Sequence, residues 1–383
     1  MARHSDRAIP LKKAQARRIW LRAQRLDEAA PFGAGPGATP AAIAHLGYVQ
    51  IDTINVVERC HHHSLYTRIP DYRREHLHRA QSEDKSVFEY RAHALAYIPA
   101  ADYRFYAGRM KEHWTRRRQS SVKPDELRKV LARIREHGAL SLRDIDDDVL
   151  TDKGDGWASR KPSAHALRLA FYGGKITVSR RTGILKTYEL TDRHFSWSSA
   201  PKPAAEKDVA EYILDRALRS QGIVSLDSVC HLDARRKPLV RQIIETRLRR
   251  KELLPVAIEG AGKQEHWTRP ATLDVCAAPV PELIHILSPF DPLIIQRKRL
   301  KLFFDYDHIF EAYVPKPKRK YGYFALPVLA GGRIVAAIDL KTDRDRQELL
   351  IRQWTWLTKG AQRTHKKDIE AALHRFERFQ LEQ

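Results

Sequence analysis

A run of helices closed by a short β-hairpin occurs twice in this chain of 383 residues, and this repeat limits the fold more than any other feature. In the clearer copy, apolar side chains recur at helical spacing over residues 125–136, and Gly138 follows as a signal that the helix ends. Residues 163–172 predict a second long helix, which ends at a pair of glycines. Two strands are then predicted at 175–180 and 186–190, with an Arg-Thr-Gly turn between them. This part of the chain therefore predicts a helical unit that ends in a basic hairpin.

The same order of elements returns further along the chain. Residues 206–219 and 237–251 predict long helices with a short helix between them, and a strand at 253–258 begins a second hairpin. In the first copy, the spacing of Ser141 and Asp144 is that of a capping pattern, which predicts a short helix there too. Three helices followed by a hairpin are the plan of a winged helix, in which the third helix enters a groove of DNA and the hairpin lies on the backbone.

We expect an α+β protein made of three tandem winged-helix units and a C-terminal β-barrel-like module. The first unit would begin with an amphipathic helix over residues 9–29. The C-terminal module is indicated by strands at 324–329 and 333–340 around a glycine turn, and by a terminal helix from Asp368. The predicted domains are 1–123, 124–200, 201–269 and 270–383.

The charge of the chain restricts its partners. The 69 lysines and arginines outnumber the 47 aspartates and glutamates, which gives a net charge of +22 and an isoelectric point near 10.0. Such an excess favours a polyanionic partner, of which nucleic acid is the commonest and an acidic membrane surface is the competitor. The chain shows neither an apolar run long enough to span a membrane nor the apolar segment of a secretory signal. We therefore expect a cytoplasmic protein.

The cysteines and histidines do not predict a metal site. Cys60, Cys230 and Cys276 are too few and too far apart for a disulfide framework or a cysteine-rich zinc site. The consecutive histidines from His61 to His63 could be read as ligands, but on a strand adjacent histidines point to opposite faces. No acidic or cysteine partner lies nearby at ligand spacing. We expect no metal and no cofactor.

The segment Val49-Gln50-Ile51-Asp52 alternates apolar and polar side chains, which is typical of a strand with one polar face. Gln50 and Asp52 would then point the same way. An amide and a carboxylate side by side can hold one water molecule, which the carboxylate deprotonates and the amide orients. The alternative is that both residues merely form the solvent face of an edge strand.

Three stretches of the chain resemble one known family. They are Gln50-Ile51-Asp52 with the His/Arg segment after it, the hairpin FYGGKITVSRR…KTYELTD, and the block LSPFDPLIIQRKRLKLFFDYDHIFEAYVPKPKRKYGYFALPVL. Together they resemble the bacterial winged-helix DNA glycosylases of the AlkZ/AlkX (YcaQ-like) family over nearly the whole chain. The resemblance implies three tandem winged helices and a C-terminal β-barrel that clamp duplex DNA. The family motif is Gln-apolar-Gln in the AlkZ branch and Gln-apolar-Asp in the AlkX branch, so this chain is similar to the AlkX branch.

The resemblance also implies an activity: a monofunctional DNA glycosylase of base excision repair that removes guanine alkylated at N7 from duplex DNA and unhooks interstrand crosslinks. The protein would act as a monomer without a cofactor. Asp52 would stabilise the sugar cation and deprotonate the attacking water, and Gln50 would orient that water. The side chains expected to contact DNA are His62, His63, Arg68, Lys161, Lys175, Arg180, Arg181, Arg297, Lys318, Arg319 and Lys320.

Two other functions compete with this interpretation. A winged-helix transcription regulator without catalysis would explain the charge and the repeated units, but it does not need an amide and a carboxylate beside a His/Arg cluster. A nuclease would need several carboxylates around a divalent metal. The acidic run Asp144, Asp146, Asp147 and Asp148 could supply them, although a solvated turn at a helix end explains the run as well.

Overall fold

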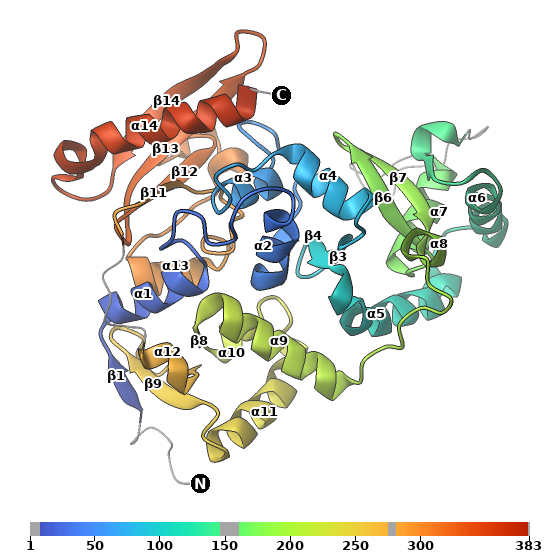
Figure 1. The fold of residues 1–383 in the computed structure, drawn as a ribbon, viewed down its shortest axis with the longest axis horizontal. Coiled ribbons are helices and arrows are strands. Elements are labelled where there is room, and N and C mark those ends of the chain that lie inside the picture. Colours follow the sequence, from blue (N-terminus) through green and yellow to red (C-terminus); the bar gives the residue numbers. More distant parts are fainter. Residues whose placement is uncertain (1–7, 146–160, 275–280, 382–383) are drawn as a thin grey trace. The chain divides into compact units, whose positions relative to one another are not determined.

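The computed structural model describes residues 8–145, 161–274 and 281–381, and it has the expected mixture of helices and strands (Figure 1). Some residues that the sequence singled out lie outside these ranges. They are Cys276, Asp146, Asp147 and Asp148.

The chain divides by its contacts into two compact units. Unit 1 is formed by Met1–Tyr72 together with Ala210–Gln383, and unit 2 is formed by Arg73–Val209. Unit 1 is therefore assembled from two segments that are far apart in the sequence. The finer division into domains with limits at 123, 200 and 269 stays a prediction.

Unit 1 combines helices with two four-stranded sheets and the short strand β2, which belongs to neither of them. Its helices are α1 (Lys13–Ala23), α2 (Ala38–Leu46), α3 (Cys60–Tyr66), α9 (Glu206–Gln221, which begins in unit 2), α10 (Leu226–Val229), α11 (Lys237–Arg249), α12 (Pro270–Asp274), α13 (Arg297–Phe304) and α14 (Ala361–Leu381). Its strands are β1 (Ile9–Leu11), β2 (Val49–Gln50), β8 (Ile223–Val224), β9 (Leu254–Ile258), β10 (His266–Thr268), β11 (Ile284–Ile286), β12 (Ala325–Ala330), β13 (Arg333–Asp343) and β14 (Glu348–Trp356).

Unit 2 is built from hairpins and the helices next to them in the chain. Its helices are α4 (Arg74–Ser82), α5 (Tyr103–Thr115), α6 (Pro124–His137), α7 (Pro162–Tyr172) and α8 (Thr191–Phe195). Its strands are β3 (Val87–Arg91), β4 (Leu95–Pro99), β5 (Leu140–Ser141), β6 (Ile176–Thr182) and β7 (Leu185–Leu190).

The hairpin that the sequence predicts in unit 2 is confirmed. Strands β6 and β7 pair antiparallel with Ile176 opposite Leu190, and β5 pairs with β7 to complete a sheet in the order β5-β7-β6. At the end of β5, the carboxylate of Asp144 accepts the backbone N–H of Ser141 at 2.7 Å, which is the expected capping contact. Because these signals are local in the sequence, they are read correctly without knowledge of the tertiary fold.

Unit 1 repeats this arrangement with one addition. Strands β8, β10 and β9 form the equivalent sheet, and β1 joins it by pairing parallel with β9. The sequence predicts a single helix over residues 9–29, and this prediction is wrong at both ends, because α1 covers only Lys13–Ala23. Residues Ile9–Leu11 form the edge strand, because Pro10 cannot occupy a helix interior but is tolerated at a sheet edge. The helix begins only at Lys13.

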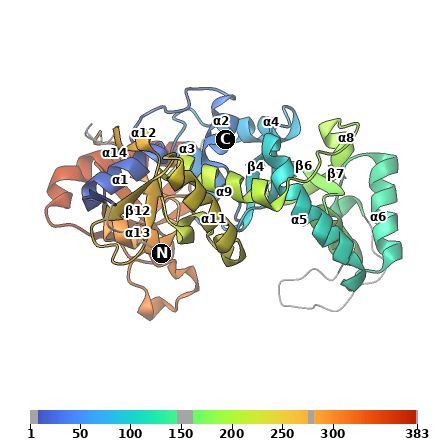
Figure 2. The same ribbon diagram turned by 90° about the horizontal axis from the view of Figure 1, so that it is seen from below.

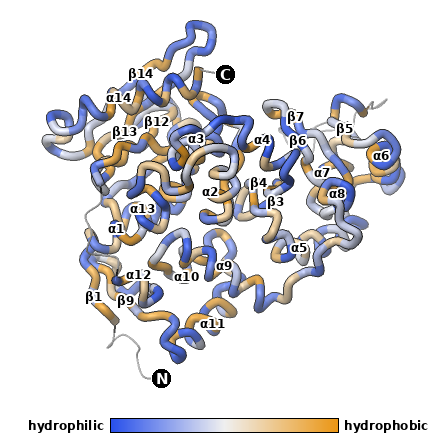
Figure 3. The backbone as a smooth tube through the Cα atoms, in the orientation of Figure 1, coloured by the Kyte–Doolittle hydropathy of each residue, from blue (hydrophilic) through white to orange (hydrophobic). Residues whose placement is uncertain are grey.

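The C-terminal sheet is open rather than a closed barrel. Its order is β11-β12-β13-β14, so β11 and β14 are edges among the residues that the structure describes. The sequence predicts two of its long strands and misses β14. Figure 3 shows hydrophobic residues concentrated along β12 and β13, where nearly every side chain is buried. Helix α14 packs on this sheet through Ile369, Leu373 and Phe376, and it begins before the predicted Asp368.

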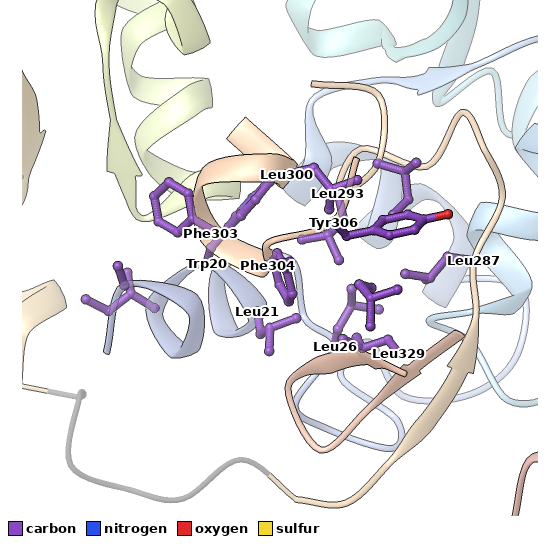
Figure 4. Packing of buried hydrophobic residues seen from close by; sticks show 14 of the residues in the cluster. Trp20, Leu21, Leu26, Leu287, Leu293, Leu300, Phe303, Phe304, Tyr306 and Leu329 are labelled. Carbon is purple, nitrogen blue, oxygen red and sulfur yellow. The ribbon is translucent and has the colours of Figure 1, made fainter. Parts of the chain in front are cut away.

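A large hydrophobic core of unit 1 joins the N-terminal helix α1 to helix α13 (Figure 4). The Trp20 ring lies edge-on to Phe303 with ring centroids 5.3 Å apart. The guanidinium of Arg299 lies over the same two rings at 4.3 and 4.5 Å and donates to the carbonyl of Ile223 at 2.7 Å. Burial lowers the pKa of Arg299 to about 9. Arg299 is therefore a structural residue of the core, although it belongs to a basic run in the sequence.

A buried ion pair makes a second connection between the two segments of unit 1. Arg68 donates two hydrogen bonds to the carboxylate of Asp291, at 2.7 and 3.0 Å, and neither side chain is exposed to solvent. The remaining guanidinium donors reach the backbone and side-chain oxygens of Gln24 and the carbonyl of Ser64. The charges are therefore both paired and hydrogen-bonded, which is the condition under which a buried pair is tolerated.

We expect the substitution Arg68→Met to lower the free energy of unfolding by about 3–5 kcal/mol, because Asp291 would remain buried without its cation. Urea unfolding measures the loss. The double variant Arg68→Met/Asp291→Leu should regain much of it, since no charge is then left unpaired. In the control Arg79→Met, which removes a half-exposed pair to Asp84, the loss should stay below about 1 kcal/mol. Equal losses for Arg68→Met and Arg79→Met would contradict this role of the buried pair.

Candidate active site

The Gln50-Ile51-Asp52 segment lies where a very short strand ends. Strand β2 covers only Val49 and Gln50, and residues 51–55 have no regular structure. The predicted strand is therefore confirmed for its first half and is wrong for Asp52. Gln50 and Ile51 are buried, at 8% and 6% exposure, whereas Asp52 is half-buried. A carboxylate that emerges from a buried strand end is fixed in position and still accessible to a substrate.

Asp52 is oriented by a hydrogen bond to its own segment. Its Oδ1 atom accepts the backbone N–H of Ile54 at 2.8 Å, a local turn that aspartate forms readily. The other oxygen, Oδ2, makes no hydrogen bond to a residue in the described ranges. One oxygen therefore holds the side chain, and the second can accept a proton.

Helix α3 holds the backbone at Gln50. The thiol of Cys60, at the first position of the helix, donates a hydrogen bond to the carbonyl oxygen of Gln50 at 3.0 Å. Burial raises the pKa of Cys60 well above its usual value, so the thiol keeps the proton that this bond requires. The sequence offers Cys60 only as a lone cysteine, and its positioning role becomes visible once Gln50 and α3 are seen together.

The segment between the Gln50-Ile51-Asp52 motif and α3 is held by the C-terminal sheet. Thr342 of β13 donates its backbone N–H to the carbonyl of Val56 at 3.0 Å and its hydroxyl to that of Val57 at 3.2 Å. Arg344 donates to the carbonyl of Val57 at 2.8 Å and to the side chain of Asn55 at 3.0 Å. These two residues follow the motif by almost 300 positions, and the sequence carries no signal that would have found them.

The three consecutive histidines lie on helix α3, not on a strand as the sequence analysis assumed. Successive helical residues point in directions about 100° apart, so each ring has a different environment. His63 is buried, donates from Nε2 to the carbonyl of Ile286 at 2.8 Å and lies 4.5 Å from the ring of Phe376. His62 is half-buried and hydrogen-bonds the hydroxyl of Tyr72 at 2.7 Å through Nδ1. Of the two histidines predicted to contact DNA, His62 is therefore the more accessible.

Two predicted DNA contacts have placements that favour a structural role. Arg68 is 1% exposed and its guanidinium is committed to Asp291 and Gln24, as described above. His63 is likewise 1% exposed. Because a phosphate contact requires an accessible donor, we do not retain Arg68 and His63 in the proposed set of DNA contacts.

The predicted contacts of unit 2 are divided between exposed and paired side chains. Lys175 and Arg180 are exposed on the hairpin, with the Lys175 ammonium 5.2 Å from the Trp114 ring centre. Arg181, by contrast, is bonded to both carboxylate oxygens of the buried Glu89, with the second contact at 2.7 Å. Lys161 is half-buried and directly precedes α7, without a side-chain hydrogen bond that caps the helix. Within this set, Lys175 and Arg180 present their charge most openly.

The remaining predicted contacts belong to unit 1 and lie on α13 and the loop that follows it. Arg297 is exposed at the start of α13. In the loop, Lys318 and Lys320 are exposed, and Arg319 donates to the carbonyl of Val314 at 2.8 Å. The loop keeps its shape because the buried Glu311 accepts three consecutive backbone N–H groups, from residues 320–322, at 2.5 to 3.2 Å. Figure 2 shows this orange loop projecting from the rest of the unit.

Within the described ranges, no group of three or more histidine, cysteine, aspartate or glutamate side chains is placed to hold a metal ion. The helices in the same ranges are all too short or too polar to cross a membrane. The predicted absence of a metal stays a prediction.

The comparisons with known proteins identify the class of this chain. A family profile described as "DNA glycosylase AlkZ-like" matches residues 43–379, which is most of the sequence. The chain therefore belongs to the AlkZ-like family of DNA glycosylases, and the predicted family is confirmed. Its fold is similar to the solved structure of the Streptomyces sahachiroi DNA glycosylase AlkZ, with a TM-score of 0.64, 17% sequence identity and coverage of 97% of each chain. The assignment to the AlkX branch stays a prediction.

We expect acid to destabilise the protein through His63. Burial lowers the pKa of His63 to about 4, whereas an unfolded histidine has a pKa near 6.5. Between these values the unfolded chain binds a proton that the folded chain does not, so stability falls as the pH falls from about 6.5 to about 4. The loss from His63 alone is of order 3 kcal/mol. Urea unfolding at a series of pH values measures it.

The variant His63→Gln should flatten this pH dependence, because it removes one group that takes up a proton on unfolding. His374→Gln, which changes a side chain exposed by 82%, is the matched control and should leave the pH dependence as in the wild type. The same slope in His63→Gln and the wild type would mean that His63 does not supply it.

Proposed function

We propose that this chain is a monofunctional DNA glycosylase that hydrolyses the N-glycosidic bond of N7-alkylated guanine in duplex DNA and unhooks interstrand crosslinks that carry such adducts. The observation that carries the proposal is the state of Asp52: one carboxylate oxygen is used for positioning and the other has no partner among the described residues. Its neighbour Gln50 is held by the Cys60 thiol. Membership of the AlkZ-like family supplies the type of reaction.

The chemistry of the proposed substrate suits a site of this kind. Alkylation at N7 gives guanine a positive charge, so it leaves with the electron pair of the glycosidic bond and becomes neutral without an acid to protonate it. The sugar that remains has oxocarbenium character, as in glycoside hydrolysis generally. The carboxylate of Asp52 stabilises that cation, and it takes a proton from the water that attacks the anomeric carbon. Gln50 orients the water, and no covalent intermediate with an amine is formed.

The repeated order of elements supports a DNA clamp made of three winged-helix units. A helix, a two-residue strand, further helical turns and a hairpin follow one another three times along the chain: from α2 to β4, from α6 to β7 and from α9 to β10. In a winged helix, the helix before the hairpin reads a groove and the hairpin lies on the backbone. The exposed Arg180 lies on the second of these hairpins, and the exposed Lys175 directly precedes it. We infer that the protein binds duplex DNA as a monomer and acts in the cytoplasm.

We expect Asp52→Asn to lower the single-turnover rate of base release by at least 100-fold, because the variant has no general base, while duplex binding stays within about twofold of the wild type. The substrate is a duplex that carries one N7-methylguanine. Hot alkali after incubation converts each abasic site into a strand break that a gel resolves. In the control Asp84→Asn, which removes an exposed carboxylate of unit 2, the rate should be unchanged.

The same assay decides between the proposal and its rivals. A transcription regulator would give no alkali-sensitive sites with the wild-type protein. A metal nuclease would give breaks without alkali, and a chelator would abolish them. Wild-type rates in Asp52→Asn would contradict the proposed role of Asp52. Replacing the monoadduct by a duplex crosslinked through N7 of guanine then tests the unhooking reaction separately.

We expect Lys318→Ala to weaken duplex binding severalfold without altering the rate of base release in the bound complex. Lys318 is exposed on the projecting loop, so its loss should remove about one phosphate contact. The slope of log affinity against log salt should therefore decrease by about 1. Fluorescence anisotropy at several salt concentrations measures the slope. Lys366→Ala, which removes an exposed lysine of α14 paired to Glu370, is the control. An unchanged slope in Lys318→Ala would exclude Lys318 from the contact set.

A further inference from the structure

A cavity of about 350 Å³ lies in unit 1 between α1, α2, α9 and α12, and it shares no residue with the candidate active site. Its volume falls within the range of small-molecule sites, about 300–1,000 Å³. The floor is apolar and includes Ile19, Ala23 and Leu218. Arginines dominate its charged lining: Arg18, Arg22, Arg25, Arg219 and Arg269, against the single carboxylate of Asp27.

The carboxylates near this cavity do not balance its arginines. Asp27 is paired with Arg22 at 2.9 Å. Arg25 and Arg269 bind carboxylates that do not line the cavity, Glu28 and Asp215.

Two arginines bring uncompensated charge to the cavity. Arg219 uses its donors on the backbone carbonyls of Ala44 and His45, each at 2.9 Å, so its positive charge is hydrogen-bonded but not neutralised. Arg18 has no carboxylate within ion-pair distance in the described ranges, and its Nε atom is buried without a hydrogen-bond partner. Arg18 therefore brings to the cavity a positive charge that no carboxylate in the described ranges offsets.

The pKa of His45 also reflects the positive charge around this cavity. Its pKa is lowered by burial and, in addition, by the charges of Arg25, Arg219 and Arg68. The ring is held by a hydrogen bond of 2.7 Å between Nε2 and the carbonyl of Ala23. The histidine is therefore a neutral donor in the wall, and the arginines carry the charge of the cavity.

We propose that this cavity binds a phosphate ester, with Arg18 as its principal ligand. Guanidinium groups match the oxygen geometry of phosphate through paired N–H donors, and the apolar floor accepts the organic part of the ester. A phosphate brings negative charge to a site where arginines exceed carboxylates, and Arg18 lines that site without a carboxylate partner in the described ranges. The proposal does not depend on the glycosylase activity, because none of the lining residues belongs to the Gln50-Ile51-Asp52 motif or to α3.

The test is calorimetric titration of the full-length protein with deoxyguanosine monophosphate at about 50 mM salt, where screening is weak. We expect a dissociation constant below about 1 mM, and at least a tenfold loss of affinity in Arg18→Gln. Arg17→Gln is the matched control. It removes the same charge from the same helix, but Arg17 does not line the proposed site; it lines a second cavity, which Arg18 and Arg333 also border. Its affinity should stay within about twofold of the wild type.

Three results would overturn the proposal: no heat of binding by the folded wild-type protein, equally tight binding of deoxyguanosine without its phosphate, or equal losses in Arg17→Gln and Arg18→Gln. A second titration in the presence of saturating duplex without terminal phosphates identifies the source of the ester. Displacement of the nucleotide assigns the cavity to a phosphate of the DNA backbone, whereas simultaneous binding assigns it to a free nucleotide. In both cases the dependence on Arg18 must persist.

Discussion

The buried contact between Arg68 and Asp291 is the interaction on which unit 1 depends, because it joins chain segments 223 residues apart. The pair offsets the cost of removing its charges from water only while every donor of Arg68 has an acceptor. Gln24 and Ser64 supply the acceptors that Asp291 does not. Three segments therefore meet at one guanidinium. The Trp20 and Phe303 core makes the same connection by hydrophobic contact, without directional demands.

The contacts that join the segments of unit 1 also position the candidate active site. Helix α3 connects two of these contacts. Cys60, its first residue, donates a hydrogen bond to the backbone of Gln50, and Arg68 lies just beyond the C-terminal end of the helix. Thr342 and Arg344 hold the segment between Asp52 and α3 from the C-terminal sheet. Because the motif itself has almost no regular secondary structure, such contacts supply the rigidity that a catalytic carboxylate needs. Substitutions in the C-terminal sheet should therefore change the position of Asp52.

Sequence reasoning succeeded where the signal is local and failed where it depends on distant partners. The hairpin of β6 and β7 and the Ser141 cap follow from residue patterns within a few positions. The alternation around Gln50 revealed the motif, but the strand ends before Asp52. The Asp52 carboxylate accepts the backbone N–H of Ile54, so this N–H does not pair with a neighbouring strand. The open C-terminal sheet, strand β14 and the roles of Thr342 and Arg344 depend on contacts that no local pattern encodes.

The net charge of +22 gave the right class of partner, but part of that charge lies inside the protein and is not accessible to DNA. Three arginines make contacts within the protein instead. Arg68 pairs with Asp291 and Arg181 with Glu89. Arg299 stacks on the Trp20 ring. Arginine suits these tasks, since its planar group can stack and bond at once, whereas lysine keeps its charge in water. The exposed cations of the hairpin and the projecting loop include Lys175, Lys318 and Lys320. Arg180 and Arg297 are exposed as well, so burial and ion pairing, rather than residue type, separate the accessible cations from the structural ones.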